Sequence, residues 1–402
     1  MEKRNIPFSP PDITEAEINE VCEALRSGWI TTGPRTKEFE KRLKEYCAAA
    51  GVVCLNSATA ALELNLRVLG IGAGDEVIVP AYTYTATASP VVHVGAAPVM
   101  VDSVKGSPEI DIDKLKEAIT EKTKAIILVD IAGIVADYDS VIAIAEERKG
   151  SFVPSNDIQK AIGRIAVLAD CAHSLGAVKN GTNAGNIADF SSFSFHAVKN
   201  LTTAEGGASA WRHIEGVDND ALYHQYQLYS LHGQSKDALA KTKLGAWEYD
   251  IVGAWYKCNM TDIAAAMGIR QLERYDDIMA RRHSIIEKYD RCCDELGVKH
   301  LTHLSDCHKG SGHLYITYIP GISAQQRNDI ICAMAEKGVA CNVHYKPLPM
   351  MTAYKNMGFD IENYPEAYDF FSKEITLPLH NKLTDEDVDY VIECFREAVR
   401  GV

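Results

Sequence analysis

The sequence lacks the long apolar runs that direct a chain into or across a membrane. Its first twenty residues, MEKRNIPFSPPDITEAEINE, have no apolar core of signal-peptide length. No stretch elsewhere approaches the apolar length that is needed to span a bilayer. We therefore expect a cytoplasmic protein that does not bind a membrane.

Paired cysteines are also missing. The chain has eleven cysteines, an odd number, and none of them form a Cys-x-x-Cys pair. They are scattered through apolar segments such as VVCLN and IICAM, a distribution that is typical of reduced, buried thiols. This pattern argues against a disulfide framework and against zinc, and we predict no metal site.

The sequence also has no excess of basic residues. The chain has 41 lysine and arginine residues against 55 aspartate and glutamate residues, which gives a formal net charge of -14. The resulting field repels polyanions, so the composition argues against nucleic acid as a partner. An anionic small ligand would need a local cluster of donors to overcome this field.

The chain does contain a regular alternation of short apolar runs and helical stretches. The runs span residues 52–55, 76–80, 97–102, 125–130, 165–170, 190–195 and 207–211. Helices are predicted between them, at 58–69, 113–119 and 139–148, and a capping box at Thr14 and Glu17 predicts a first helix that ends near Gly28. Strands that alternate with helices predict an α/β fold with a mostly parallel sheet covered on both faces.

The chain of 402 residues is too long for one small core, and its pattern changes after about residue 260. One long helical stretch over 262–296 leads into a mixed region. That region has predicted strands at 313–319 and 339–345 and predicted helices at 325–338 and 384–399. We predict a large domain over 1–255 and a smaller C-terminal α/β domain over 256–402. The polar residues 149–164 predict a surface loop or insertion.

Two titratable residues lie where open α/β sheets bind ligands. Asp170 ends the predicted strand IAVLAD, and Lys199 follows the apolar run of FSFHAVKNLTTAEGG. Pyridoxal phosphate needs a lysine amine to form an imine with its aldehyde and a carboxylate to hold its pyridine nitrogen protonated. An isolated aspartate and lysine are more often surface or salt-bridge residues, so this pair needs further support.

Three other segments supply that support. Ser57 and Thr59 begin an apolar helix, and a helix N-terminus with hydroxyls is suited to bind a phosphate, although a plain N-cap has the same sequence. Tyr84 or Tyr82, after the run EVIV, could stack on a flat ring or pack in the core. Ser194, five residues before Lys199, is within reach of the same phosphate.

The chain resembles the DegT/StrS-type sugar-nucleotide aminotransferases, which are fold-type-I pyridoxal-phosphate enzymes. The resemblance covers nearly the whole length, through NSATAALELNL, GAGDEVIVPAYTYTATA, LADCAHSLGA, FSFHAVKNLTTAEGG, YKCNMTDIAAAMGIRQLE and GVACNVHYKPLP, among other segments. It implies a large domain with a seven-stranded sheet. Asp130 stands where many members have histidine, and Ala58 replaces a common glycine.

The resemblance also implies roles for individual residues. Lys199 would carry the cofactor as a Schiff base, and Asp170 would contact its ring nitrogen. The other implied cofactor contacts are Ser57, Ala58, Thr59, Tyr84, His173, which stands where glutamine is commoner, Ser194 and Asn259. Residues that match the lining of the sugar-nucleotide pocket are Trp29, Thr31, His232, His344 and Tyr345. Asn259 matches a residue that reaches the neighbouring subunit's cofactor, which implies a homodimer with composite active sites.

The implied activity is transfer of an amino group from glutamate, through pyridoxamine phosphate, to a nucleotide-linked keto sugar of the 4-keto-6-deoxy type. Such a reaction belongs to surface-polysaccharide or amino-sugar biosynthesis. The presence of Lys199 disfavours the related dehydratases, in which histidine replaces the lysine. Two alternatives remain open: a non-catalytic regulatory protein of the same fold, and another fold-type-I enzyme such as a decarboxylase or an amino-acid aminotransferase.

Overall fold

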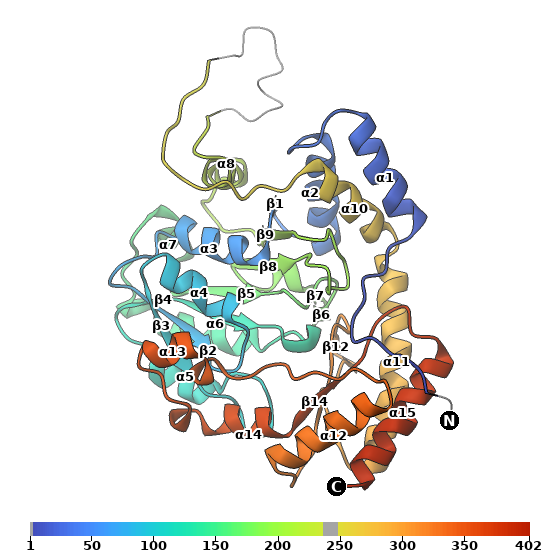
Figure 1. Ribbon diagram of the computed structural model, residues 1–402. Coiled ribbons are helices and arrows are strands. Elements are labelled where there is room, and N and C mark those ends of the chain that lie inside the picture. The colour runs from blue at the N-terminus through green and yellow to red at the C-terminus, as the bar shows by residue number, and fades with distance from the viewer. Residues whose placement is uncertain (1–2, 236–247) are drawn as a thin grey trace.

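The first half of the chain builds one large sheet. The computed structural model describes residues 3–235 and 248–402. Seven strands lie in the order β1-β9-β8-β5-β4-β2-β3 (Figure 1). Their bounds are β1 Gly51–Leu55, β2 Glu76–Pro80, β3 Ala97–Val101, β4 Thr123–Val129, β5 Ala166–Asp170, β8 Phe190–Ser194 and β9 Gly207–Trp211. Only the pairs that involve β9 are antiparallel, so the predicted seven-stranded, mostly parallel sheet is confirmed.

Neighbouring residues of the central strands enter different cores. In β4, Ile126 packs in the cluster that contains Tyr138 of α6 (Tyr138–Glu147), whereas Ile127 packs in the cluster that contains Leu62 of α3 (Ala58–Val68). The pleat sends successive side chains to opposite faces, and both faces are covered by helices. This double burial explains why the strand reads as a continuous apolar run in the sequence.

Helices cover the sheet in the pattern that the sequence predicts. The connections after the strands contain α3, α4 Thr85–His93, α5 Ile112–Ala118, α6, α7 Asp157–Ile162 and α8 Asn219–Ser230. At the N-terminus, α1 (Glu15–Arg26) begins with the predicted Thr14–Glu17 capping box, and α2 spans Pro34–Cys47. Both α1 and α2 pack against α10 (Asp262–Glu273).

The last part of the chain forms a second sheet of three strands, in the order β10-β13-β14, with helices around it. Its strands are β10 Lys299–His300, β13 Tyr315–Tyr318 and β14 Glu374–Leu377. Its helices are α11 Tyr275–Leu296, α12 Ala324–Glu336, α13 Thr352–Asn356, α14 Pro365–Lys373 and α15 Asp385–Arg400. A small sheet, β11-β12-β6-β7, joins the two parts of the chain. Its strands are β6 Val178–Lys179, β7 Thr182–Asn183, β11 Leu304–Ser305 and β12 His308–Lys309. The division at residue 255 stays a prediction.

The helical stretch over 262–296 is confirmed, but it is divided into α10 and α11, which meet at Arg274. The Arg274 side chain bonds Asp12 and Glu17. Two sequence-based expectations are wrong. The strand over 339–345 is absent, and only isolated bridges, Ile6↔Val339 and Asn342↔Thr376, occur there. The polar segment 149–164 is not all loop, because α7 lies in it and its Gln159 is buried.

None of the helices in the described part of the chain has the length and apolar character that crossing a membrane requires.

A buried ion pair connects the strands of the large sheet. Asp189 accepts hydrogen bonds from Arg164 at 2.8 and 3.0 Å, from Arg212 at 2.6 Å and from the Val167 N–H at 2.8 Å. Substituting Asp189→Asn leaves the Arg164 guanidinium, 3% exposed, without its main counter-charge. Breaking such a buried pair is expected to lower the free energy of unfolding by about 3 kcal/mol, measured by urea denaturation.

Arg26→Gln is the matched control, because it removes a bridge to Glu23 that is largely exposed and is expected to leave the urea midpoint unchanged. An Asp189→Asn protein with the same midpoint as the control would show that the buried pair does not stabilise the sheet.

Candidate active site

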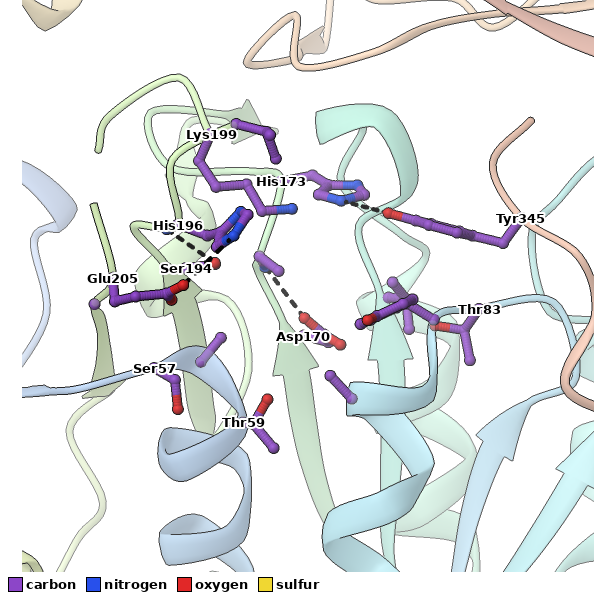
Figure 2. Close-up of a pocket in the computed structure, with 17 residues that line it drawn as sticks. Ser57, Thr59, Thr83, Asp170, His173, Ser194, His196, Lys199, Glu205 and Tyr345 are labelled. Atoms are coloured by element: carbon purple, nitrogen blue, oxygen red, sulfur yellow. Dashed lines mark hydrogen bonds and ion pairs between the residues drawn. The ribbon is translucent and has the colours of Figure 1, made fainter. Parts of the chain in front are cut away.

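A cavity of about 310 Å³ lies at the carboxyl ends of the parallel strands (Figure 2). Its lining residues are Ser57, Ala58, Thr59, Thr83, Tyr84, Ala86, Val129, Asp170, Ala172, His173, Ser194, His196, Val198, Lys199, Glu205, Gly206 and Tyr345. All but Tyr345 come from strand ends and the connections beside them at one edge of the large sheet, where open α/β folds bind their ligands. The cavity therefore brings together nine of the predicted site residues.

Asp170 lies at the floor of the cavity, at the end of β5. Its Oδ2 accepts a hydrogen bond from the Thr87 hydroxyl at 2.7 Å, and its Oδ1 accepts one from the Ala172 N–H at 3.2 Å. These two donors are uncharged. Burial raises the pKa of the Asp170 carboxyl, while the two hydrogen bonds and the charge of Lys199 act in the opposite direction. A cation beside the carboxylate would stabilise its ionised form.

Lys199 extends into the same cavity from the loop after β8, and its amine lies between Ser194 and His173 in Figure 2. The Lys199 backbone N–H donates to the His196 carbonyl at 2.9 Å, which closes the turn that directs the side chain inward. Burial lowers the pKa of the Lys199 amine to about 8, against the attraction of Asp170. At pH 7 about one amine in ten is then neutral, against about one in three thousand for an ordinary lysine.

The N-terminus of α3 forms another wall. The Ser57 hydroxyl accepts from the Ala60 N–H at 3.1 Å, so Ser57 is the N-cap of this helix and also lines the cavity. The first backbone N–H groups of a helix have no partners within it and attract anions. Gly207 allows this close packing, because a Cβ there would lie 2.3 Å from the carbonyl carbon of Ser57 and 2.4 Å from the Ala58 nitrogen.

His173 and Tyr345 join the two parts of the chain across the cavity. The Nδ1 atom of His173 accepts from the Ala132 N–H at 3.3 Å, and its Nε2 lies 3.0 Å from the Tyr345 hydroxyl. Burial keeps the pKa of His173 well below its ordinary value, so the ring is neutral and its one proton is on Nε2. His173 therefore donates to the oxygen of Tyr345, whose own proton is free to be donated elsewhere.

Five predicted residues, Trp29, Thr31, His232, Asn259 and His344, lie outside the cavity lining. Trp29, Thr31, His232 and Asn259 belong to segments that lie together around residues 256–262. Trp29 donates from Nε1 to the Thr32 carbonyl at 3.2 Å, and the Asn259 amide donates to the Thr32 hydroxyl. The His232 N–H donates to the Tyr256 carbonyl at 2.7 Å. His344 does not line the cavity either, but its ring lies 4.9 Å from that of Tyr345.

Sequence reasoning missed the partners of the predicted residues. Because Thr87 donates to Asp170, Thr83 must donate to Thr87 across their 2.7 Å contact, which orients both hydroxyls. The repeated threonines of PAYTYTATA, directly after a predicted strand, were the available signal. Glu205 lies 3.6 Å from His196 at the cavity wall, and no local pattern indicated that pair.

Asp130, which departs from the pattern of the resembled family, does not line the cavity. It is fully buried and accepts from the Ser174 hydroxyl at 2.6 Å, the Tyr138 hydroxyl at 2.9 Å and the Ala136 N–H at 3.0 Å. The bond to Ser174 holds the turn that follows Asp170, so Asp130 stabilises the backbone next to the cavity without facing it.

Comparison with known proteins agrees with this geometry. Residues 11–396 match the DegT/DnrJ/EryC1/StrS aminotransferase family. A curated relative, the spore coat polysaccharide biosynthesis protein SpsC of Bacillus subtilis, is 35% identical over 100% of this chain and 99% of its own length. A putative sugar aminotransferase from Streptococcus pneumoniae, solved in its PMP form, is 57% identical with a TM-score of 0.96, covering 99% of this chain and all of that one. The Helicobacter pylori aminotransferase PseC is 27% identical with a TM-score of 0.86, over 99% of this chain and all of PseC.

The fold thus defines a fold-type-I aminotransferase, and its candidate site is the cavity at the carboxyl edge of the large sheet. The chain belongs to the DegT/DnrJ/EryC1/StrS aminotransferase family, and it is a sugar aminotransferase of that family.

The lowered pKa of Lys199 leads to a prediction for the cofactor-free protein. Its rate of reductive methylation, followed by peptide mass spectrometry, is expected to rise with a midpoint near pH 8 rather than at the pH of an ordinary lysine, because burial favours the neutral amine. In Asp170→Asn the midpoint is expected to fall further, since the negative charge that raises the lysine pKa is removed.

The exposed Lys105, measured in the same digests, is the internal reference, and its profile is expected to be identical in both proteins. A Lys199 profile that coincides with that of Lys105, or that moves to higher pH in Asp170→Asn, would contradict this description of the cavity.

Proposed function

We propose that this protein is a pyridoxal-phosphate aminotransferase that moves an amino group from glutamate to a nucleotide-linked keto sugar. One observation carries the proposal. A single cavity contains a half-buried lysine whose pKa is lowered to about 8, a buried carboxyl and the N-terminus of a helix. Support comes from the 57% identical Streptococcus pneumoniae protein, which has also been solved in a PLP form, and from the polysaccharide role in the name of the Bacillus subtilis relative.

The residues present fit this cofactor. The cavity offers an amine for the aldehyde at Lys199, and N–H groups and hydroxyls for the phosphate at Ser57–Thr59 and Ser194. Burial raises the pKa of the Asp170 carboxyl, and its hydrogen-bond partners are all uncharged. A protonated ring nitrogen would therefore supply the missing opposite charge. Tyr84, 58% exposed at the mouth, presents a ring that can stack on a flat heteroaromatic group.

When bound, pyridoxal phosphate supplies an aldehyde that reacts with amines and a cationic ring that accepts electrons from the substrate carbon. Lys199 would hold the cofactor covalently and, once displaced by the amino donor, would move a proton at the α-carbon of that donor as base and then acid. Its lowered pKa favours this role, because the neutral amine is the reactive form. Asp170 would keep the proton on the ring nitrogen, and Thr87 would hold the Asp170 carboxylate in place.

The keto sugar would approach Tyr345, which lines the cavity, and the neighbouring His344. We propose a 4-keto-6-deoxy sugar on a nucleotide as the acceptor, with Trp29, Thr31 and His232 as contacts for it. These three residues lie outside the lining of their own chain's cavity. A second subunit could bring them to it, so we propose a homodimer with composite sites, in which Asn259 reaches the partner's phosphate.

The direct test is spectroscopic. The purified protein loaded with pyridoxal phosphate is expected to lose its visible cofactor absorbance when glutamate is added and to recover it when a keto-sugar nucleotide from a panel is added. Lys199→Ala is expected to abolish turnover while the protein still folds, since the amine that holds the cofactor and moves the proton is gone. Steady turnover by Lys199→Ala, or no spectral response of the parent protein to any amino donor, would rule out the proposed function.

Subunit mixing tests the composite site. A Lys199→Ala chain and an Asn259→Ala chain are each expected to be nearly inactive. After subunit exchange, each mixed dimer has one site with both lesions and one with neither. An equimolar mixture is therefore expected to recover about a quarter of the parent activity, because about half of the dimers are mixed.

The alternative is that Asn259 only organises its own chain through Thr32 and Met260. In that case the mixture would never exceed the sum of its parents, although exchange was verified by mass spectrometry of tagged subunits. Thr261→Ala is a useful control, since Thr261 caps α10 two residues away through the Ala264 N–H.

A further inference from the structure

A segment of the second part of the chain lies against the walls of the cavity without lining it. Residues 310–314 connect β12 to β13. The Ser311 N–H donates to the Gly133 carbonyl at 2.9 Å, and the His313 N–H donates to the Ala132 carbonyl at 3.1 Å. The Ser311 hydroxyl donates to the His173 carbonyl. The segment is therefore fixed to the two turns that carry His173 and its partner Ala132.

The side chain of His313 reaches the residue next to Lys199. The Asn200 amide donates from Nδ2 to the Ser311 carbonyl at 2.9 Å, which leaves its Oδ1 as the acceptor that faces His313 Nδ1 at 3.0 Å. His313 Nδ1 must therefore carry the ring proton and donate it to Asn200. His313 is 4% exposed, so this bond is shielded from water.

The other face of His313 packs against His173. The two ring centroids are 4.4 Å apart at an angle of 43°, and His173 in turn lies 3.0 Å from the Tyr345 hydroxyl. The charged and titratable groups around the pair are Lys199, Arg282 and His344, and with burial they hold the pKa of both histidines well below the ordinary value. Both rings are thus neutral, and one line of contacts runs from Asn200 through His313 and His173 to Tyr345.

We propose that His313 is a positioning residue that couples the Lys199 loop to the His173–Tyr345 pair. The Nδ1 atom of His313 fixes Asn200. Its ring also holds the His173 ring so that Nε2 of His173 faces the Tyr345 hydroxyl, which leaves the Tyr345 proton available inside the cavity. This inference rests on the proposed function, because its consequence is felt at the cofactor. His313 itself touches no part of the cavity lining other than His173 in the contacts described.

The test is a pH titration of the visible absorbance of the bound cofactor, which reports the environment of Lys199 and of the cofactor without turnover. His313→Ala is expected to move the titration midpoint by about half a pH unit or more, because the groups that face the cofactor lose their fixed orientation. Tyr345→Phe is expected to move it in the same direction. The double variant is expected to shift less than the sum of the two, as coupled residues do.

His303→Ala is the matched control. His303 is also a buried histidine stacked on an aromatic ring, with its centroid 6.4 Å from that of Tyr315, but neither ring nitrogen has a hydrogen-bond partner in the described residues. It is expected to lower thermal stability as His313→Ala does and to leave the titration midpoint unchanged. Equal midpoints for the two variants, or additive shifts in the double variant, would overturn the inference.

Two further variants keep the test decisive if His313→Ala does not fold. Asn200→Ala removes the acceptor of the His313 proton without altering either ring and is expected to shift the midpoint in the same direction. His313→Asn keeps a donor near the Nδ1 position and loses the ring, so it is expected to recover part of the shift. An unshifted midpoint in both would overturn the inference, whereas a parent protein that binds no pyridoxal phosphate would refute the proposed function instead.

Discussion

The whole site depends on the burial of two opposite charges in one cavity. Lys199 and Asp170 attract each other, yet removal from water acts against the charged form of each and dominates both pKa values. The result is an amine that gives up its proton far more readily than a surface lysine and a carboxyl that is suited to a cationic partner. Both properties disappear if water enters the cavity, because the burial that creates them is lost.

The rest of the fold holds this burial in place. The parallel strands end together, so Asp170 and the loop of Lys199 meet at one edge although they are 29 residues apart in the sequence. Behind that edge, the buried Asp130 holds the turn after Asp170 through hydroxyl and backbone donors. From the other side, the second part of the chain supplies Tyr345, which lines the cavity, and the segment 310–314, which holds the turn of His173 from outside the lining.

Elements whose cause is local were predicted from the sequence, and elements whose cause lies in distant parts of the chain were not. The seven strands were predicted correctly because most of them are buried on both faces, which leaves an apolar run that is visible locally, as in Thr123–Val129, and because the partly exposed edge strand β3 is apolar as well. The strand predicted over 339–345 failed because its apolar residues pack individually, Val339 beside Ile6 and Tyr345 in the cavity wall, without a strand partner. The division at Arg274 has no proline or glycine to mark it in the sequence, and the partners of the Arg274 side chain, Asp12 and Glu17, lie near the N-terminus of the chain.

For the site, local sequence was sufficient wherever a residue's position is set by the strand or helix that precedes it. Asp170 at a strand end, Ser57 and Thr59 at a helix start, and Lys199 after a strand all follow from order along the chain, and all line the cavity. The proton positions were decided only by tertiary contacts. The tautomers of His173 and His313 depend on donors and acceptors at Ala132, Asn200 and Tyr345, from three separate segments. A hydrogen bond between distant segments has no local periodicity, so only the folded chain determines which atom donates.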